Sequence, residues 1–372
     1  MILYAFAATW ATALVTAATS TSINARQSTW QIDPNPVFDL GAESGDTLDT
    51  FGEVVGAARV PNGDIVVADA KYHSLRYCMP DRKFRRSAGR QGDGPGEFQS
   101  IMATMRCGDS LFVQARGTGR WSVFGPTGVF KRRYIPVLPS MRDQVPYDIR
   151  CNTTGLLIND GWENPADRKV AAFRSAVPFW MANADGLIHA WLGDLPSGER
   201  YGTVSRSTGP MPLGKQPVIA IGLTRAYVGT ADSFANMVFG FNGKSIGMVR
   251  KANVNLVTTP ADIQQFIAFD TAGKLEDYKA SDLRRFQEMN FPSTIPAYRN
   301  LAVESEDDVW VERYPRAGEN TSHWVVFSPT GTEFVQVHLP SNLKIQEIGY
   351  ALGIATELPD SVHHVKMYHP KR

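Results

Sequence analysis

Short stretches of alternating apolar and polar residues, separated by tight turns, recur along this chain. The clearest example lies between residues 56 and 98, where the turn Pro61-Asn62-Gly63 precedes an apolar stretch at 64–68 and the turn Pro80-Asp81 follows another at 75–78. Alternation with a period of two, bounded by turn residues, is typical of β-strands, and no helical period fits this segment. The pattern predicts a compact unit of antiparallel strands.

One strand and its turn are repeated almost unchanged. The sequence WSVFGPTG at 121–128 returns as WVVFSPTG at 324–331, and weaker copies occur at 75–81, 179–186, 237–243 and 365–370. Each copy reads as the third strand of a repeated unit running into a turn. About six such units fall within the range of blade numbers in β-propellers. We therefore predict an all-β fold, a six-bladed β-propeller.

The spacing of the turn glycines locates an insertion. Gly128, Gly186 and Gly243 come at nearly equal intervals, whereas Gly331 comes much later. The surplus coincides with a helical pattern, which predicts a small helical insertion at 253–296, between blades four and five.

Helix signals within the insertion predict two helices. Thr259 is expected to be an N-cap residue with Pro260 at the first helical position. A second helix is expected to begin at Ser281-Asp282 and to end at Phe291-Pro292.

The final copy, at 365–370, ends the chain after a third strand, so its fourth strand must come from elsewhere. The extended, proline-spaced segment Thr29 to Leu40 suits the outer edge of that last blade, where missing amide donors are tolerated. We expect this N-terminal strand to close the propeller.

Composition is that of an ordinary globular protein. The chain has 372 residues, of which 43% are hydrophobic and 20% charged, and we assign residues 29–370 to a single domain. Lys and Arg number 38 against 37 Asp and Glu, and no clustered basic stripe is evident, so nucleic acid is not an expected partner. We expect a monomer.

The apolar run from Ile2 to Ala18 has no charge before Arg26, which suits a signal peptide at 1–25 and a secreted or periplasmic protein. Its lack of an initial Lys or Arg leaves a misassigned start or a short membrane anchor open, and a buried N-terminal helix is a further alternative. No transmembrane span is expected beyond this leader.

Three cysteines, Cys78, Cys107 and Cys151, are too few for a disulfide scaffold and too irregularly spaced for a zinc site. Cys107 and Cys151 occupy similar places in successive blades, so a disulfide between neighbouring inner strands is conceivable in an exported protein. Buried free thiols are the favoured expectation.

Residues 56–98 resemble an NHL-type blade. The resemblance rests on Val67-Ala68-Asp69, on the strand at 72–78, and on the exit GRQGDGPGEF at 89–98. The passages 296–301 and 309–314 are similar to exported bacterial six-bladed β-propeller proteins. Cys78 and Arg82 depart from the pattern. The resemblance implies a propeller fold and export, without an assigned activity.

Two motifs are read as structural. The glycine-rich segment 92–96 lacks the Lys-Ser/Thr of a phosphate-binding loop, so we expect a tight crossing between blades, with Glu97 and Phe98 in capping and packing roles. His73, His323 and His364 each precede a third strand, away from the axis, where ligand distances of about 2.1 Å to one zinc ion are not expected.

Long connections predict the functional face. The connections between blades and between second and third strands emerge on one face of a propeller, and they include the long segments 135–146, 160–177, 196–217 and 253–296. Function usually resides where a rigid scaffold carries elaborated loops. We call this the long-loop face and expect the binding surface there, over the axis.

Seven polar or aromatic residues at loop ends or strand starts are candidate ligand contacts: Tyr147, Asp148, Asp160, Trp162, Tyr298, Arg299 and Arg313. The alternative for Arg299 and Arg313 is a structural role in hydrogen bonds between blades. No catalytic residue is predicted, because no Gly-x-Ser-x-Gly follows a strand and no Cys pairs recognisably with a His.

The sequence thus favours an exported, non-catalytic binding module for a protein, peptide or small-molecule ligand, with no cofactor. The alternative is a metal-dependent propeller enzyme of the lactonase, hydrolase or amidating-lyase type, with calcium or zinc on the axis and Asp148 with Asp160 as the first ligands to test. A purely structural surface protein is a third possibility.

Overall fold

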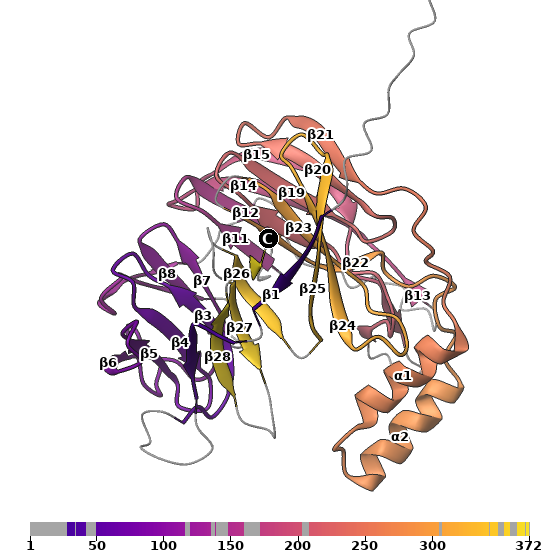
Figure 1. The fold of residues 1–372 in the computed structure, drawn as a ribbon, viewed down its shortest axis with the longest axis horizontal. Coiled ribbons are helices and arrows are strands. Elements are labelled where there is room, and N and C mark those ends of the chain that lie inside the picture. The colour runs from indigo at the N-terminus through magenta and orange to yellow at the C-terminus, as the bar shows by residue number, and fades with distance from the viewer. Residues whose placement is uncertain are drawn as a thin grey trace, which may run out of the picture.

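The computed structural model describes residues 28–33, 35–41, 50–115, 120–134, 138, 148–159, 172–202, 208–304, 307–341, 343–348, 353–357, 363–368 and 370–371. Within these residues the chain is mostly β, with seven sheets and two helices (Figure 1).

Four of the sheets consist of four strands of the main repeat, which follow one another in the chain except that β13 (Ala172–Phe173) comes between the second and third strands of sheet 3. Sheet 1 holds β3 (Val54–Arg59), β4 (Ile65–Asp69), β5 (Ser74–Cys78) and β6 (Phe84–Ala88). Sheet 2 holds β7 (Ile101–Cys107), β8 (Ser110–Ala115), β9 (Trp121–Phe124) and β10 (Phe130–Tyr134). Sheet 3 holds β11 (Asp148–Cys151), β12 (Gly155–Asn159), β14 (Ala176–Asn183) and β15 (Ile188–Pro196). Sheet 4 holds β18 (Val218–Ile221), β19 (Arg225–Gly229), β20 (Ala235–Gly240) and β21 (Ser245–Arg250).

The last two sheets of the repeat also take strands from the chain ends. Sheet 5 holds β22 (Tyr298–Val303), β23 (Val309–Arg313), β24 (Thr321–Phe327) and β25 (Glu333–Pro340), extended by β1 (Ser28–Ile32) and β29 (Pro370–Lys371). Sheet 6 holds β26 (Lys344–Ile348), β27 (Gly353–Glu357), β28 (His364–Tyr368) and β2 (Phe38–Leu40). A separate small sheet joins β13 (Ala172–Phe173), β16 (Arg200–Gly202) and β17 (Thr208–Pro210).

The first strands of sheets 1 to 6 lie next to one another in sequence order. β3 contacts β7, β7 contacts β11, and the series continues through β18, β22 and β26, which contacts β3 again. The second strands β4 and β12, each flanked by the first and third strands of its own sheet, are buried along their whole length. A strand covered on both faces must be apolar on both, which explains their continuous hydrophobic runs.

The repeat predicted from the sequence is present. Each of the six copies contributes to the third strand of its sheet: β5, β9, β14, β20, β24 and β28. The turn glycines Gly128, Gly186, Gly243 and Gly331 all have positive φ. Glycine tolerates this conformation best, because a side chain there is sterically strained.

The N-terminal segment is divided between two sheets. Phe38 pairs with Met367 and Leu40 with Val365, so β2 forms the antiparallel outer strand of sheet 6, as predicted. β1 instead runs parallel to β25, with Trp30 opposite Val337 in sheet 5. The prediction for the start of this segment was therefore wrong: its apolar side chain Trp30 packs in the core between sheets 5 and 6.

The helical insertion is a pair of antiparallel helices that projects from the sheets (Figure 1). α1 (Pro260–Thr271) begins as predicted, with a capping box between Thr259 and Asp262. α2 (Glu276–Gln287) begins before the expected Ser281-Asp282 and ends before Phe291-Pro292. Glu276 and Asp277 lie in its first turn, where carboxylates interact favourably with the helix dipole, and this earlier start signal outweighs the later one.

Two sequence interpretations concern covalent and local structure. Cys107 and Cys151 form a disulfide between β7 and β11, with their Cα atoms 5.3 Å apart, so the favoured expectation of free thiols was wrong for this pair. Cys78 is a buried thiol. The glycine-rich exit of sheet 1 is structural as predicted: Glu97 accepts a hydrogen bond from the Gly94 N–H at 2.8 Å, and Phe98 is fully buried.

Candidate functional site

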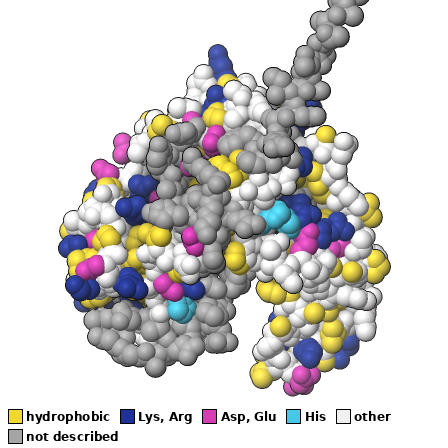
Figure 2. Space-filling model, viewed as in Figure 1, with side chains coloured by type: hydrophobic (Ala, Val, Ile, Leu, Met, Phe, Trp, Pro, Cys, Tyr) yellow, Lys and Arg dark blue, Asp and Glu magenta, His cyan; other side chains and the backbone are white. Residues whose placement is uncertain are grey.

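Sheet 5 carries a cluster of charged and imidazole side chains at its long-loop end, beside the helical pair. Figure 2 shows basic, acidic and histidine side chains gathered there, next to β22–β25. We call these residues the arginine–histidine cluster. Arg299, Glu312 and Ser322 are joined on one side of the sheet, and Arg313, Glu319, His323 and His338 lie together on the other.

The buried carboxylate of Glu312 holds Arg299 in place. Its Nη2 lies 2.5 Å from Glu312 Oε1, and the same oxygen accepts a hydrogen bond from Ser322 Oγ at 2.5 Å. The Glu312 side chain is 7% exposed and that of Arg299 is 40% exposed. A buried carboxylate needs a cationic partner, so Glu312 holds the guanidinium of Arg299 in place. The part of the guanidinium that does not contact Glu312 faces solvent.

Arg313, at the end of β23, forms an ion pair with Glu319 in the following loop. Glu319 also accepts a hydrogen bond from the backbone N–H of Arg316 at 2.8 Å. Burial alone would raise the pKa of Glu319, but the hydrogen bonds from Arg316 and Arg313 outweigh it and lower that pKa. Glu319 is therefore ionised at neutral pH and fixes Arg313.

Two histidines complete the cluster. His323 of β24 and His338 of β25 are cross-strand partners, and their ring centroids are 4.4 Å apart. Thr321 Oγ1 lies 3.1 Å from His323 Nε2. Burial lowers the pKa of His323, and the charges of Arg313 and His338 lower it further against the opposing effect of Glu319. His323 is therefore a neutral imidazole at pH 7, able to accept or donate one hydrogen bond.

The loop between β23 and β24 ties the helical pair to this cluster. Arg316 Nη2 lies 2.8 Å from Asp262 Oδ2, Ala317 N–H donates to Asp262 Oδ1 at 3.0 Å, and Gly318 N–H donates to Gln265 Oε1 at 2.8 Å. Burial disfavours the charged Asp262, yet the hydrogen bonds from Thr259 and Ala317 and the charge of Arg316 lower its pKa. The first turn of α1 is thereby fixed at the border of the cluster.

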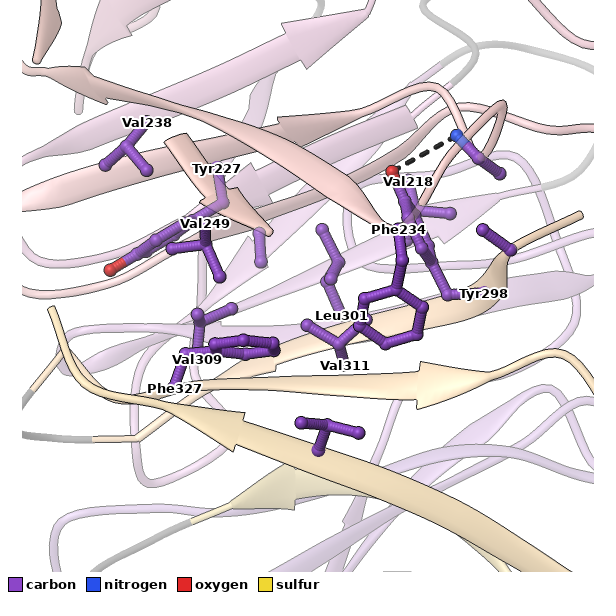
Figure 3. Packing of buried hydrophobic residues seen from close by; sticks show 14 residues of the cluster. Val218, Tyr227, Phe234, Val238, Val249, Tyr298, Leu301, Val309, Val311 and Phe327 are labelled. Carbon is purple, nitrogen blue, oxygen red and sulfur yellow. Dashed lines mark hydrogen bonds between the residues drawn. The ribbon is translucent and has the colours of Figure 1, made fainter. Parts of the chain in front are cut away.

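Tyr298 is a packing residue. Its side chain is fully buried between sheets 4 and 5, against Phe234 (Figure 3). The hydroxyl accepts a hydrogen bond from Ala231 N–H at 3.1 Å and donates one to Ala235 O at 3.0 Å, and burial raises its pKa. With both hydrogen-bonding roles taken inside the core, Tyr298 does not face the long-loop surface, contrary to the sequence interpretation.

The remaining candidates are not brought together. Asp148 begins β11 of sheet 3 and forms an ion pair with Arg150. Burial raises the pKa of Asp148, with Arg150 opposing the shift. Arg299 pairs with Glu312 of the same sheet, and Arg313 pairs with Glu319 in the loop between β23 and β24. Tyr147, Asp160 and Trp162 lie outside the described residues.

His364 and the adjacent His363 have separate partners. His364 Nδ1 lies 2.9 Å from Asp39 Oδ1, whereas the adjacent His363 accepts a hydrogen bond from Val54 N–H at 3.3 Å. His363 precedes β28, and its partner Val54 lies in sheet 1, whereas Asp39 lies in sheet 6. In the part of the chain that the structure describes, no three His, Cys, Asp or Glu side chains are grouped as metal ligands.

Sequence reasoning missed the carboxylates that organise the site. Glu312 and Glu319 have ordinary sequence surroundings, and the partnership of His323 with His338 depends on the register between β24 and β25. A usable signal existed in the alternation of β23 and β24, which places Arg313 and His323 on one side of the sheet and Glu312 and Ser322 on the other.

Known proteins resemble this chain in structure but not in sequence. No family model matches the chain, and no curated protein is similar in sequence. A member of the DUF4221 family from Bacteroides vulgatus has a similar structure, with a TM-score of 0.53 and 10% identity over 93% of this chain and 100% of its own. A predicted exported protein of Bacteroides fragilis matches with a TM-score of 0.49 and 12% identity over 90% of this chain and 94% of its own.

These neighbours are β-propeller-like proteins, and the likeness to the DUF4221 protein shows that this chain has a propeller-like fold. None of the helices within the described residues is long and apolar enough to cross a membrane.

Proposed function

We propose that this chain is an exported, monomeric six-bladed β-propeller of the NHL type, which is closed by β2 and binds a ligand on its long-loop face. The circular contacts among the first strands of sheets 1 to 6 and the pairing of β2 with β28 support six blades and closure. The disulfide between Cys107 and Cys151 supports export, because disulfides persist in oxidising compartments.

The binding role rests on one observation: Arg299 and Arg313 are held by carboxylates at the long-loop end of sheet 5 while their side chains stay 40% and 30% exposed. A guanidinium fixed in this way retains donors for a carboxylate, phosphate or carbonyl group of a ligand at low entropic cost. The ligand is a small molecule or peptide with such acceptor groups, and neutral His323 adds a hydrogen-bonding partner beside Arg313.

Charge-removing variants test this role. We would screen carboxylates, phosphates and acidic peptides by thermal shift, and compare the wild type with Arg299→Gln and Arg313→Gln. Arg106→Gln is the matched control, since Arg106 also pairs with a carboxylate, that of Glu347, but lies in β7 of sheet 2 with its side chain 39% exposed. Loss of ligand-induced stabilisation in the two sheet 5 variants alone supports the proposal. An equal response in all variants contradicts it.

The second candidate is a metal-dependent enzyme, which the raised pKa of Asp148 favours. A carboxyl group with a raised pKa at the start of an innermost strand is a common feature of catalytic sites. Of the two candidate ligands, Asp148 and Asp160, only Asp148 lies within the described residues, and its carboxylate pairs with Arg150. Elemental analysis of the wild type and Asp148→Asn decides: stoichiometric metal lost in the variant favours the enzyme.

A further inference from the structure

The outer strand of sheet 4 is exposed along most of its length. β21 ends that sheet and, within the described residues, pairs only with β20. Five of its six residues are exposed, and Ile246 and Met248 are each 52% exposed. In the outer strands β6 and β10, exposed residues alternate with less exposed ones and are Arg, Lys or Ser. Charges on an edge strand oppose pairing with another strand, whereas β21 has none from Ser245 to Val249.

Sheet 5 shows how such an edge is covered in this protein. β25 is the fourth strand of sheet 5, as β21 is of sheet 4, and β1 runs parallel to it on its outer side, beside residues 335–338. Val335 pairs with Val326, and Gly247 pairs with Val238 at the same place in the repeat. The stretch of β21 that corresponds to the β1-binding stretch of β25 is therefore 247–250.

The two edges differ in their cover. Val335 and Val337 of β25 are 2% and 1% exposed, and Trp30 of β1 packs in the same hydrophobic cluster. A Cβ added at Gly247 of β21 would meet no described atom within 4 Å. Sheet 4 thus has open space at the position where sheet 5 buries a side chain.

We propose that β21 binds an extended segment of a partner protein, which adds to sheet 4 as β1 adds to sheet 5. The outward N–H and C=O groups of an edge strand match the spacing of another β-strand, so an extended peptide is favoured over a compact ligand. Apolar side chains of the added segment would cover Ile246 and Met248.

Charges at the two ends of β21 indicate what flanks the apolar part of that segment. Lys244 and Arg250 are exposed and form no ion pair among the described residues. Asp232, the only acidic residue from the start of β18 to the end of β21, and Glu333 of sheet 5 have other cationic partners. Acidic flanks are therefore expected. A second copy of this chain fits less well, because antiparallel pairing about Gly247 would set Lys244 opposite Arg250.

The experiment measures binding of fluorescent peptides to the full-length protein by anisotropy. The probe has the β1 sequence, Ser-Thr-Trp-Gln-Ile, with aspartates at both ends, and we call it the aspartate peptide. The lysine peptide has lysines in place of the aspartates. We expect the aspartate peptide to bind more tightly than the lysine peptide. Hydrogen exchange should show added protection of backbone amides in β21 on binding, with little change in β25.

Two variants of β21 test the edge and its charges. Ile246→Lys with Met248→Lys should weaken binding of the aspartate peptide about tenfold or more, because charges on an edge strand oppose pairing. Lys244→Glu with Arg250→Glu keeps the apolar pair and should reverse the preference between the two peptides. All four side chains are exposed, so both variants should have the denaturation midpoint of the wild type.

The control is Val129→Lys with Leu223→Lys, because these apolar side chains are 64% and 57% exposed in connections outside β21. The control should bind like the wild type, and so should Arg299→Gln, which separates this edge from the long-loop site.

Four results would overturn the proposal. The first is no binding of the aspartate peptide up to about 1 mM, and the second is an equal loss in the control. The third is protection in β25 instead of β21, which would mean that the peptide displaces β1. The fourth is a wild-type dimer in light scattering that Ile246→Lys with Met248→Lys abolishes, which would make a second copy the occupant.

Discussion

His323 and His338 face each other across β24 and β25, with ring centroids 4.4 Å apart and ring planes at 67°. Protonating His323 would place a second cation next to Arg313, which is one of the causes of its lowered pKa. The folded protein therefore accommodates the two rings while His323 is neutral. Protonation of His323 is unfavourable there, so the stability of the folded protein depends on pH.

Stability should fall as the pH drops through the range in which free histidine titrates. The pKa of His323 in the folded protein is below its usual value of about 6.5. The unfolded chain therefore binds more protons at this residue, and acidification stabilises the unfolded state relative to the folded state. The stability that neutral His323 contributes to the folded protein is fully present above about pH 6.5 and is lost as the pH falls. His323→Gln should lose less stability than the wild type between pH 7.5 and pH 5, as measured by urea unfolding. An identical pH slope in both proteins would contradict the lowered pKa of His323.

Removing the hydroxyl of Tyr298 should destabilise the fold. Tyr298→Phe leaves the Ala231 N–H and the Ala235 carbonyl without their buried partner, at a cost of about 1–3 kcal/mol. Tyr278→Phe is the control, because Tyr278 is 68% exposed and its variant should unfold like the wild type. Denaturant titration measures both. A neutral Tyr298→Phe would mean that the folded protein lacks these two buried hydrogen bonds.

The disulfide predicts a simple thiol count. Native protein should show no reactive thiol, and unfolded but unreduced protein should show one, because Cys78 is buried and Cys107 is bonded to Cys151. Replacing both bonded cysteines by Ser should cost about 2–4 kcal/mol of stability. Three thiols in the unfolded, unreduced protein would show that the bond is absent.

The outer strand of sheet 6 should be essential for stability. Phe38 is 3% exposed in the core between sheets 1 and 6, so Phe38→Ala should cost about 3–5 kcal/mol. Val37 is 53% exposed, and Val37→Ala should change stability little. Denaturation midpoints compare the two. Equal, small effects would mean that β2 contributes little to closing the fold.

Several features of the fold could be predicted because they are local. The six third strands follow from short repeats such as 121–128 and 324–331, and the start of α1 follows from the Thr259 cap. Both depend on residues within a few positions of one another, so alternation and capping residues suffice to find them. The start of α2 was missed because two competing start signals lie close together in the sequence.

The site itself could not be predicted to the same extent. Arg299 and Arg313 were candidates from the sequence, but Glu312, Glu319 and His338, which position them and complete the cluster, were not. Tyr298 was a candidate only because an aromatic residue at a strand start suits either a core or a surface. The packing of sheet 4 against sheet 5 decides between these environments.

The sequence by itself determined the strands, their tight turns, the repeat and the place of the helical insertion, because each depends on contacts between near neighbours in the chain. Only the tertiary structure decided that Cys107 meets Cys151, that β1 joins β25, and that Arg133 of β10 meets the backbone of Asp93. These contacts join residues far apart in the sequence, and they are set by how whole sheets pack, which no local pattern encodes.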